Sequence, residues 1–109
     1  MSYGKVRNSG GVFVKADLDS VTAAAATAKM PADFRVSITN APGKEAYPIS
    51  SFTWLLIPQN IKDGTKREVI KGFLEWMLSD GQTMTGALAY APLPKEVVSM
   101  EKKAVSSIQ

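Results

Sequence analysis

The fold class of this 109-residue chain is indicated by one run, Tyr47-Pro48-Ile49-Ser50-Ser51-Phe52-Thr53-Trp54-Leu55-Leu56-Ile57. Tyr47 must be extended, because a following proline pushes a residue out of the α region. Residues 52–57 are apolar, aromatic or β-branched with little alternation, which is typical of a strand covered on both faces in a parallel sheet flanked by helices. Pro58 ends the run. We therefore expect a strand over residues 52–57 in an α/β fold.

The part of the chain before this run predicts a hairpin, a helix and a strand. Short apolar-containing stretches at 5–7 and 12–14 flank the turn cluster 8–11, whose two glycines accept positive φ. The turn lacks the Lys-Ser/Thr of a phosphate loop, so a plain β-hairpin is expected. Asp17 is the expected N-cap of a helix that Pro31 stops. Alternation over 34–39 predicts a half-buried strand.

The residues after the run 47–57 predict three helices. Thr65 and Glu68 have capping-box spacing for a helix over 65–80, with Gly81 as the glycine that follows its end. A short helix is expected over 82–89, and a last one over 95–108 with Pro94 in its first turn. The expected order is β, β, α, β and then β, α, α, α. The pattern of residue types changes near Tyr47-Pro48.

Composition excludes several chemistries. The chain has no Cys and no His, so disulfides, thiolate nucleophiles, His-based triads and zinc sites with nitrogen or sulfur ligands are impossible within it. The net charge of +3 is spread evenly, with no basic stripe for nucleic acid. The longest apolar run is too short for membrane insertion, and the N-terminal residues predict no signal peptide. We expect no metal, no cofactor, no catalytic residue and no enzyme activity.

Several segments together resemble the C-terminal portion of periplasmic phosphate-binding proteins, the PstS-type substrate-binding subunits of phosphate ABC transporters. The run Ala46 to Ile57 carries the resemblance together with Phe73-Leu74-Glu75-Trp76-Met77-Leu78, Asp80-Gly81-Gln82, Tyr90-Ala91-Pro92-Leu93-Pro94-Lys95-Glu96-Val97-Val98 and the hairpin Tyr3 to Val14. It covers nearly the whole chain, and the order of the segments is more specific than any one of them.

The resemblance implies a partial periplasmic-binding-protein-like (type II) fold. Residues 1–46 would be the tail of the second lobe, with hairpin, helix and strand. Residues 47–109 would be the closing part of the first lobe, with a strand and helices. Tyr47 and Pro48 would be the hinge or crossover between the lobes. The family's phosphate contacts lie mainly in segments that this chain does not contain, which leaves only Ser50, Ser51 and Arg35 as weak phosphate-binding candidates.

Two functions remain open at this stage. The first is a fragment or truncated homologue of a phosphate-binding protein, periplasmic by resemblance and working with an ABC permease, but itself lacking the phosphate site. The alternative is a non-catalytic, self-associating module with no anion binding. An incomplete sheet exposes open edges and apolar faces, so we expect a homodimer or a partner that supplies the missing lobe.

Overall fold

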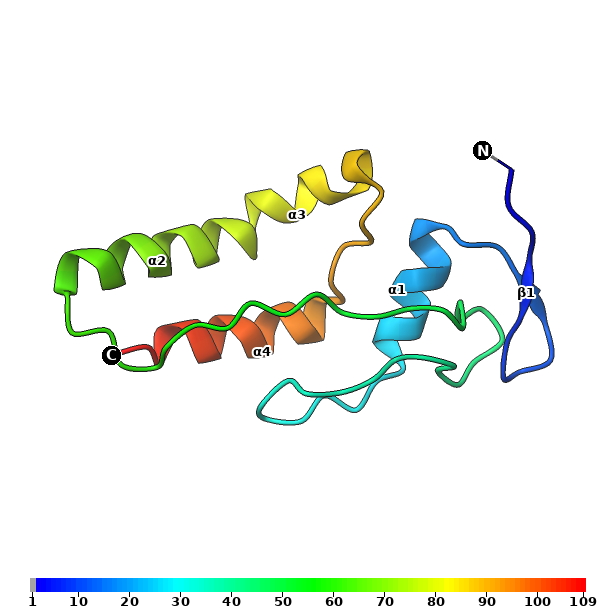
Figure 1. Cartoon of the computed structure of the whole chain (residues 1–109), viewed down its shortest axis with the longest axis horizontal. Coiled ribbons are helices and arrows are strands. Elements are labelled where there is room, and N and C mark those ends of the chain that lie inside the picture. The colour runs from blue at the N-terminus through cyan, green and yellow to red at the C-terminus, as the bar shows by residue number, and fades with distance from the viewer. Residues whose placement is uncertain (1) are drawn as a thin grey trace.

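The structure is a computed structural model that describes residues 2–109; Met1 lies outside the described part. The elements are β1 (Val6–Arg7), β2 (Phe13–Val14), α1 (Leu18–Ala26), α2 (Gly64–Met77), α3 (Asp80–Met84), the 3-10 helix η1 (Thr85–Leu88) and α4 (Lys95–Ser106). Figure 1 shows α2 and α3 along one long side of the molecule, α4 beside α2, and the hairpin at the opposite end. The chain therefore has the predicted α/β class.

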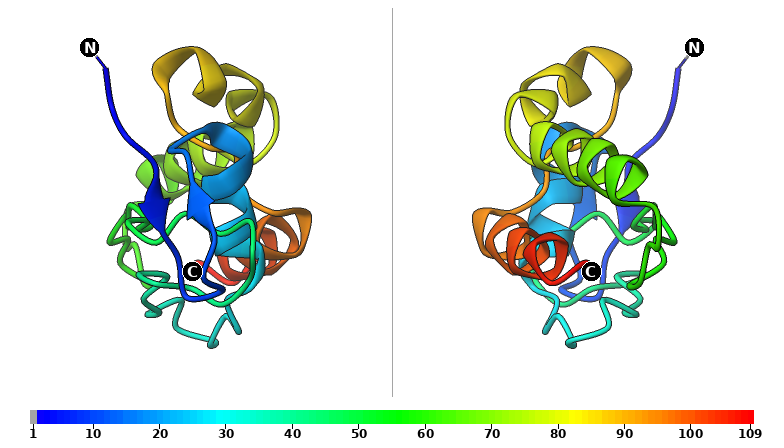
Figure 2. Two further views of the ribbon diagram at one scale, coloured as in Figure 1. Left: turned by 90° about the vertical axis from the view of Figure 1, so that its right-hand side faces the viewer. Right: turned by 90° about the vertical axis from the view of Figure 1, so that its left-hand side faces the viewer.

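The predicted hairpin is confirmed. β1 and β2 pair antiparallel, with Val6 opposite Val14 and Arg7 opposite Phe13. The Asn8 amide donates to the Val12 carbonyl at 2.9 Å and closes the turn. Gly11 has a φ of 79°, a left-handed conformation that glycine adopts without the steric cost of a side chain. Figure 2 (left) looks along the long axis from the hairpin end, with the two strands in front of the helices.

The turn also fixes a distant loop through a single side chain. Asn8 is 6% exposed, and its Nδ2 donates to the carbonyl oxygens of Gly43, Lys44 and Ala46 at 2.9–3.1 Å. Its Oδ1 accepts the backbone amide of Val12 at 3.1 Å. One side-chain amide thus satisfies main-chain groups of two segments that are 35–38 residues apart.

The helix after the hairpin begins as predicted. Asp17 is its N-cap: the carboxylate accepts the Ser20 amide, while the Ser20 hydroxyl oxygen accepts the Asp17 amide. The helix ends at Ala26, before Pro31 is reached. Its buried face contributes Ala24 to a small cluster with Ala41 and Ala46, which is the core of the N-terminal half.

The helices of the C-terminal half are confirmed, with corrections to their ends. α2 is capped by Asp63, whose carboxylate accepts the Lys66 amide, and not by the predicted Thr65–Glu68 box. Asp63 is placed better because it lies before the first helical residue. Gly81 lies inside α3, and the predicted helix 82–89 is divided between α3 and η1. Leu74, Leu78 and Val105 form the core between α2 and α4.

Two of the four predicted strands are absent from the described residues. Within residues 2–109 the only β-ladder joins β1 and β2, so neither 34–39 nor 52–57 is a strand. Phe34 has a φ of 60°, outside the β region, although burial alternates through 34–39 as predicted. The prediction that 52–57 is covered on both faces is wrong for this chain, since Leu56 is 94% exposed. A strand needs a hydrogen-bonding neighbour, and neither segment has one.

We predict that Asn8→Ala destabilises the fold by about 1–3 kcal/mol, because it leaves the buried Ala46 carbonyl and two part-buried carbonyls without a donor. Chemical denaturation followed by circular dichroism measures the loss. Asn60→Ala is the matched control, since Asn60 is exposed and should change stability little. Equal stability of the two variants would show that the bridge from Asn8 to the loop at 43–46 does not hold the fold.

Candidate functional site

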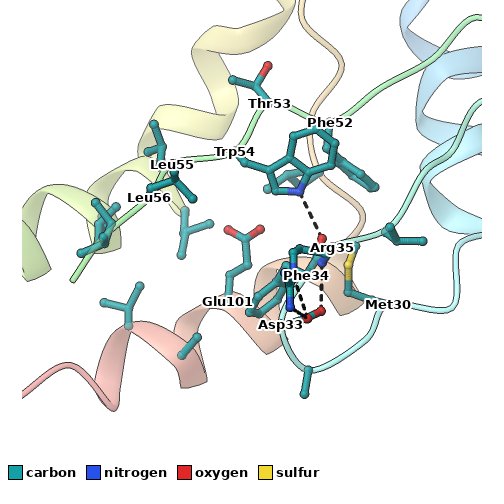
Figure 3. A pocket seen from close by; sticks show the side chains of 18 of the residues that line it. Met30, Asp33, Phe34, Arg35, Phe52, Thr53, Trp54, Leu55, Leu56 and Glu101 are labelled. Atoms are coloured by element: carbon teal, nitrogen blue, oxygen red, sulfur yellow. Dashed lines mark hydrogen bonds and ion pairs between the residues drawn. The ribbon is translucent and has the colours of Figure 1, made fainter. Parts of the chain in front are cut away.

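The candidate site is an open apolar groove of about 1,300 Å³. Two extended segments and the facing sides of α2 and α4 line it (Figure 3). The lining includes Phe34, Trp54, Leu55, Leu74, Glu101 and Val105. The run that indicated the fold class therefore forms one wall of an open groove and is not inside a sheet.

Trp54 joins the two extended segments across the groove. Its indole Nε1 donates to the Phe34 carbonyl at 3.1 Å, and its ring meets that of Phe52 edge to face with centroids 6.3 Å apart. The side chain is nonetheless 47% exposed. The groove is thus bridged by one hydrogen bond, while the aromatic contact lies within one segment, and the groove remains open to solvent.

Glu101 is the ionisable group that points into the groove from α4 (Figure 3). Burial among apolar neighbours raises the pKa of its carboxyl group above the ordinary value. No cation forms an ion pair with it among the described residues. The groove that partly buries Glu101 is also lined by residues of α2 and of the extended run, so the pattern of the last helix alone does not indicate this burial.

The three weak phosphate candidates do not converge. The Arg35 guanidinium pairs with the Asp33 carboxylate at 2.8 Å, and both side chains are exposed. The Ser50 hydroxyl donates to the Tyr47 carbonyl at 2.8 Å, and the Ser51 hydroxyl donates to the Phe52 carbonyl at 3.1 Å. Arg35 and Ser51 line the groove, whereas Ser50 does not. Each group is engaged with a different partner.

The Arg35–Asp33 contact is local. The backbone amide and the guanidinium of Arg35 both donate to the carboxylate of Asp33, and these bonds lower the pKa of that carboxyl group. Arg35 thus sits two residues from its counter-ion on an exposed turn. A guanidinium that is already paired with a carboxylate has fewer N–H groups and less positive charge available for an anion than an unpaired guanidinium has.

The predicted hinge is held at both residues. The Tyr47 amide donates to the Ser20 carbonyl of α1 at 3.0 Å, and the Pro48 carbonyl accepts the Asn40 amide at 2.7 Å. Pro48 is buried. These bonds tie the point where the two halves meet to the N-terminal half.

Helix N-termini, which can bind anions through their free amides, already have carboxylates here. Asp17 caps α1 and Asp63 caps α2, each accepting a backbone amide. The first turns of α3 and α4 contain Asp80 and Glu96. Each of these four termini therefore carries negative charge where a phosphate would need positive potential.

No cluster of three or more acidic residues that could hold a metal ion occurs in the described part of the chain. Across residues 2–109, none of the helices has the length and apolar character needed to span a bilayer. Apart from its apolar walls, the groove is lined by three charged side chains, the paired Asp33 and Arg35 and the unpaired Glu101.

Comparison with curated proteins gives a consistent result. The chain is 36% identical over 90% of its length to the phosphate-binding protein PstS of Xylella fastidiosa, and 30% identical over 94% to that of Haemophilus influenzae. It is 34% identical over 95% to PstS of Methanocaldococcus jannaschii. The chain matches a portion of PstS. It spans only 28–31% of the length of these PstS proteins. No protein-family model matches it.

The role of Asn8 was missed by sequence reasoning. Asn8 was assigned to the hairpin turn alone, although its type is one that commonly bonds backbone groups. Its bonds to residues 43–46 depend on a loop far along the sequence, so no local signal could have indicated them.

We predict that Glu101→Gln stabilises the protein at neutral pH. Folding raises the pKa of the Glu101 carboxyl, so the charged form is destabilised above the raised pKa and the penalty disappears as pH falls to the ordinary pKa. Thermal melting at neutral and acidic pH measures the difference, with the exposed Glu75→Gln as control. A stabilisation equal at both pH values would contradict the assignment.

Proposed function

We propose that this chain is a scaffold part of a PstS-type phosphate-binding protein used for phosphate import. The observation that carries the proposal is the match over about nine-tenths of the chain to proteins named for phosphate binding. By that relationship the whole protein is located in the periplasm. Its ligand is phosphate and its partner is an ABC permease. The function is binding and not catalysis.

Within that protein, residues 1–46 are the tail of one lobe and residues 47–109 the closing part of the other, with Tyr47 and Pro48 as the crossover. The separation of the two small cores supports this division. One consists of Ala24, Ala41 and Ala46, and the other lies between α2 and α4. The whole protein accordingly has a periplasmic-binding-protein-like fold of type II.

The chain by itself lacks the phosphate site. Three features favour this: Arg35 is paired with Asp33, the hydroxyls of Ser50 and Ser51 donate to carbonyl groups, and four helix N-termini carry carboxylates. A phosphate bound by this chain would need donors that converge on one point. The groups that bind phosphate would then come from the rest of the protein.

We predict that a chimera of the Xylella fastidiosa PstS, in which this full chain replaces the matched portion, binds phosphate. The replaced portion supplies scaffold and not ligands, so affinity should stay within about tenfold of the parent, a free-energy difference of about 1.4 kcal/mol. Isothermal titration with phosphate measures it, with sulfate as the competing anion. A folded chimera that does not bind phosphate would overturn the proposed function.

We predict that the isolated chain melts at the same temperature with millimolar phosphate as with sulfate at equal ionic strength. A ligand that binds the folded state raises the melting temperature, so an absent site gives no difference. Differential scanning fluorimetry measures this. A rise specific to phosphate, lost in Arg35→Gln but kept in the control Arg67→Gln, would place a site in this chain and contradict the scaffold assignment.

A further inference from the structure

Residues 51–57, called here the pairing segment, have main-chain groups that are open to a second strand. No backbone amide of the segment donates a hydrogen bond within residues 2–109, and no β-ladder includes it. The Trp54 indole, and not the main chain, bonds the segment to the Phe34 carbonyl. Figure 1 shows the segment as an extended strip beside α4. Main-chain groups in an apolar segment are normally paired, so this segment is suited to strand pairing.

The exposed surface of the molecule is large enough for a stable interface. The accessible surface is 7743 Å² for 11.7 kDa, against about 5,900 Å² for a compact monomer of that mass. The radius of gyration is 15.9 Å, against about 13 Å for a compact chain of this length. The excess of roughly 1,900 Å² is more than the ~800 Å² that each protomer buries in a standard interface.

The charge pattern favours a second copy of the chain as the partner. No charged residue lies between Glu45 and Lys62, so two copies of the pairing segment meet without like charges opposite each other. A charged partner would find no complementary charge within the segment. The segment also contains none of the charges or prolines that keep exposed edge strands apart. It is therefore complementary to itself, which a two-fold interface requires.

Two-fold symmetry fixes how two pairing segments lie against each other. Strands related by a two-fold axis through their centre run antiparallel. When the whole segment enters the ladder, its middle residue, Trp54, lies opposite Trp54 of the second copy. Thr53 then lies opposite Leu55, and Phe52 lies opposite Leu56. Cross-strand pairs between aromatic and aliphatic side chains stabilise such a ladder.

We propose that two copies of this chain form a two-fold dimer by antiparallel pairing of residues 51–57, with Trp54 opposite Trp54 at the axis. The homodimer expected from the sequence thereby has a defined surface. Since an isolated two-stranded ribbon is only marginally stable, apolar burial must contribute to the dimer. Trp54, Leu55 and Leu56, which are 47%, 54% and 94% exposed, supply that burial. The inference goes beyond the proposed function, because it concerns the chain alone and does not depend on phosphate.

Light scattering of the full chain over a range of concentrations tests the dimer. We expect a mass twice the 11.7 kDa of the chain, which falls toward the monomer on dilution. Amide exchange at 51–57 should be about tenfold slower or more in the dimer than in the dilute monomer. A monomer at every concentration, an assembly larger than a dimer, or a dimer with 51–57 unprotected would overturn the inference.

A pair of lysine substitutions tests the surface. Leu55→Lys with Leu56→Lys should raise the dissociation constant of the dimer about tenfold or more, because four ammonium groups then lie around the axis. Val69→Lys with Leu88→Lys is the matched control. These two apolar residues of α2 and η1 are 67% and 70% exposed and lie outside the segment, so the control adds the same charge and should leave the dimer unchanged. Circular dichroism checks that both variants fold, and equal weakening by both pairs would overturn the assignment to 51–57.

The register is tested by disulfide crosslinking, which the absence of cysteine from the chain makes specific. Thr53→Cys in one copy lies opposite Leu55→Cys in the other, within reach of a disulfide. Two copies of the same variant place their cysteines two residues apart along the ladder, which is too far. A mixture of the two variants should crosslink several-fold faster on mild oxidation than either variant alone. Equal rates, or no crosslink in the mixture, would overturn the proposed pairing even where the lysine variants fail to fold.

Discussion

The pairing of main-chain hydrogen-bonding groups is the constraint on which the rest of this structure depends. A helix pairs all but its first amides within itself. Thus α1 and α2 form where a side-chain cap precedes an apolar face, and α4 forms with an apolar face but without a side-chain cap. A strand cannot do so, and beyond the hairpin no segment of the described chain offers 51–57 a ladder partner. The result is a set of helices joined by extended segments, with an open apolar groove where a sheet would fill the space.

Side-chain amides and an indole hold the segments together in place of a sheet. Asn8 ties the hairpin to the loop at 43–46. Gln82 donates to the Met77 carbonyl and accepts the Leu93 amide, so it ties the end of α2 to the segment before α4. Trp54 ties the two extended segments. Each bridge is a point contact, whereas a ladder would add bonds along a whole strand, which accounts for an expanded molecule with two small cores.

The sequence predicted the elements whose causes are local. Asp17 caps α1 and the turn glycines close the hairpin because neighbouring residues suffice for both, and Pro94 marks the start of α4 for the same reason. The cap of α2 was misplaced by two residues because both Asp63 and Thr65 are suitable types. The prediction of a strand at 52–57 is wrong for this chain. An apolar pattern indicates the environment in which a segment would be stable, but not whether a partner strand is present. Ser50, Ser51 and Arg35 have the residue types of an anion site, but convergence depends on tertiary placement.

The half-buried carboxyl group of Glu101 adds a requirement for any group that covers the groove. Glu101 already has a raised pKa with the groove open to solvent. A sheet packed against α4 would remove more water from its carboxyl, and an unpaired carboxylate in a drier site is costly. Asp33 and Arg35 also line the groove, but they are paired with each other. Any cover over the groove would therefore have to bring a hydrogen-bond donor or a cation opposite Glu101, or the carboxyl group would have to take up a proton. Because the second case makes covering the groove more favourable at lower pH and the first does not, its pH dependence distinguishes the two arrangements.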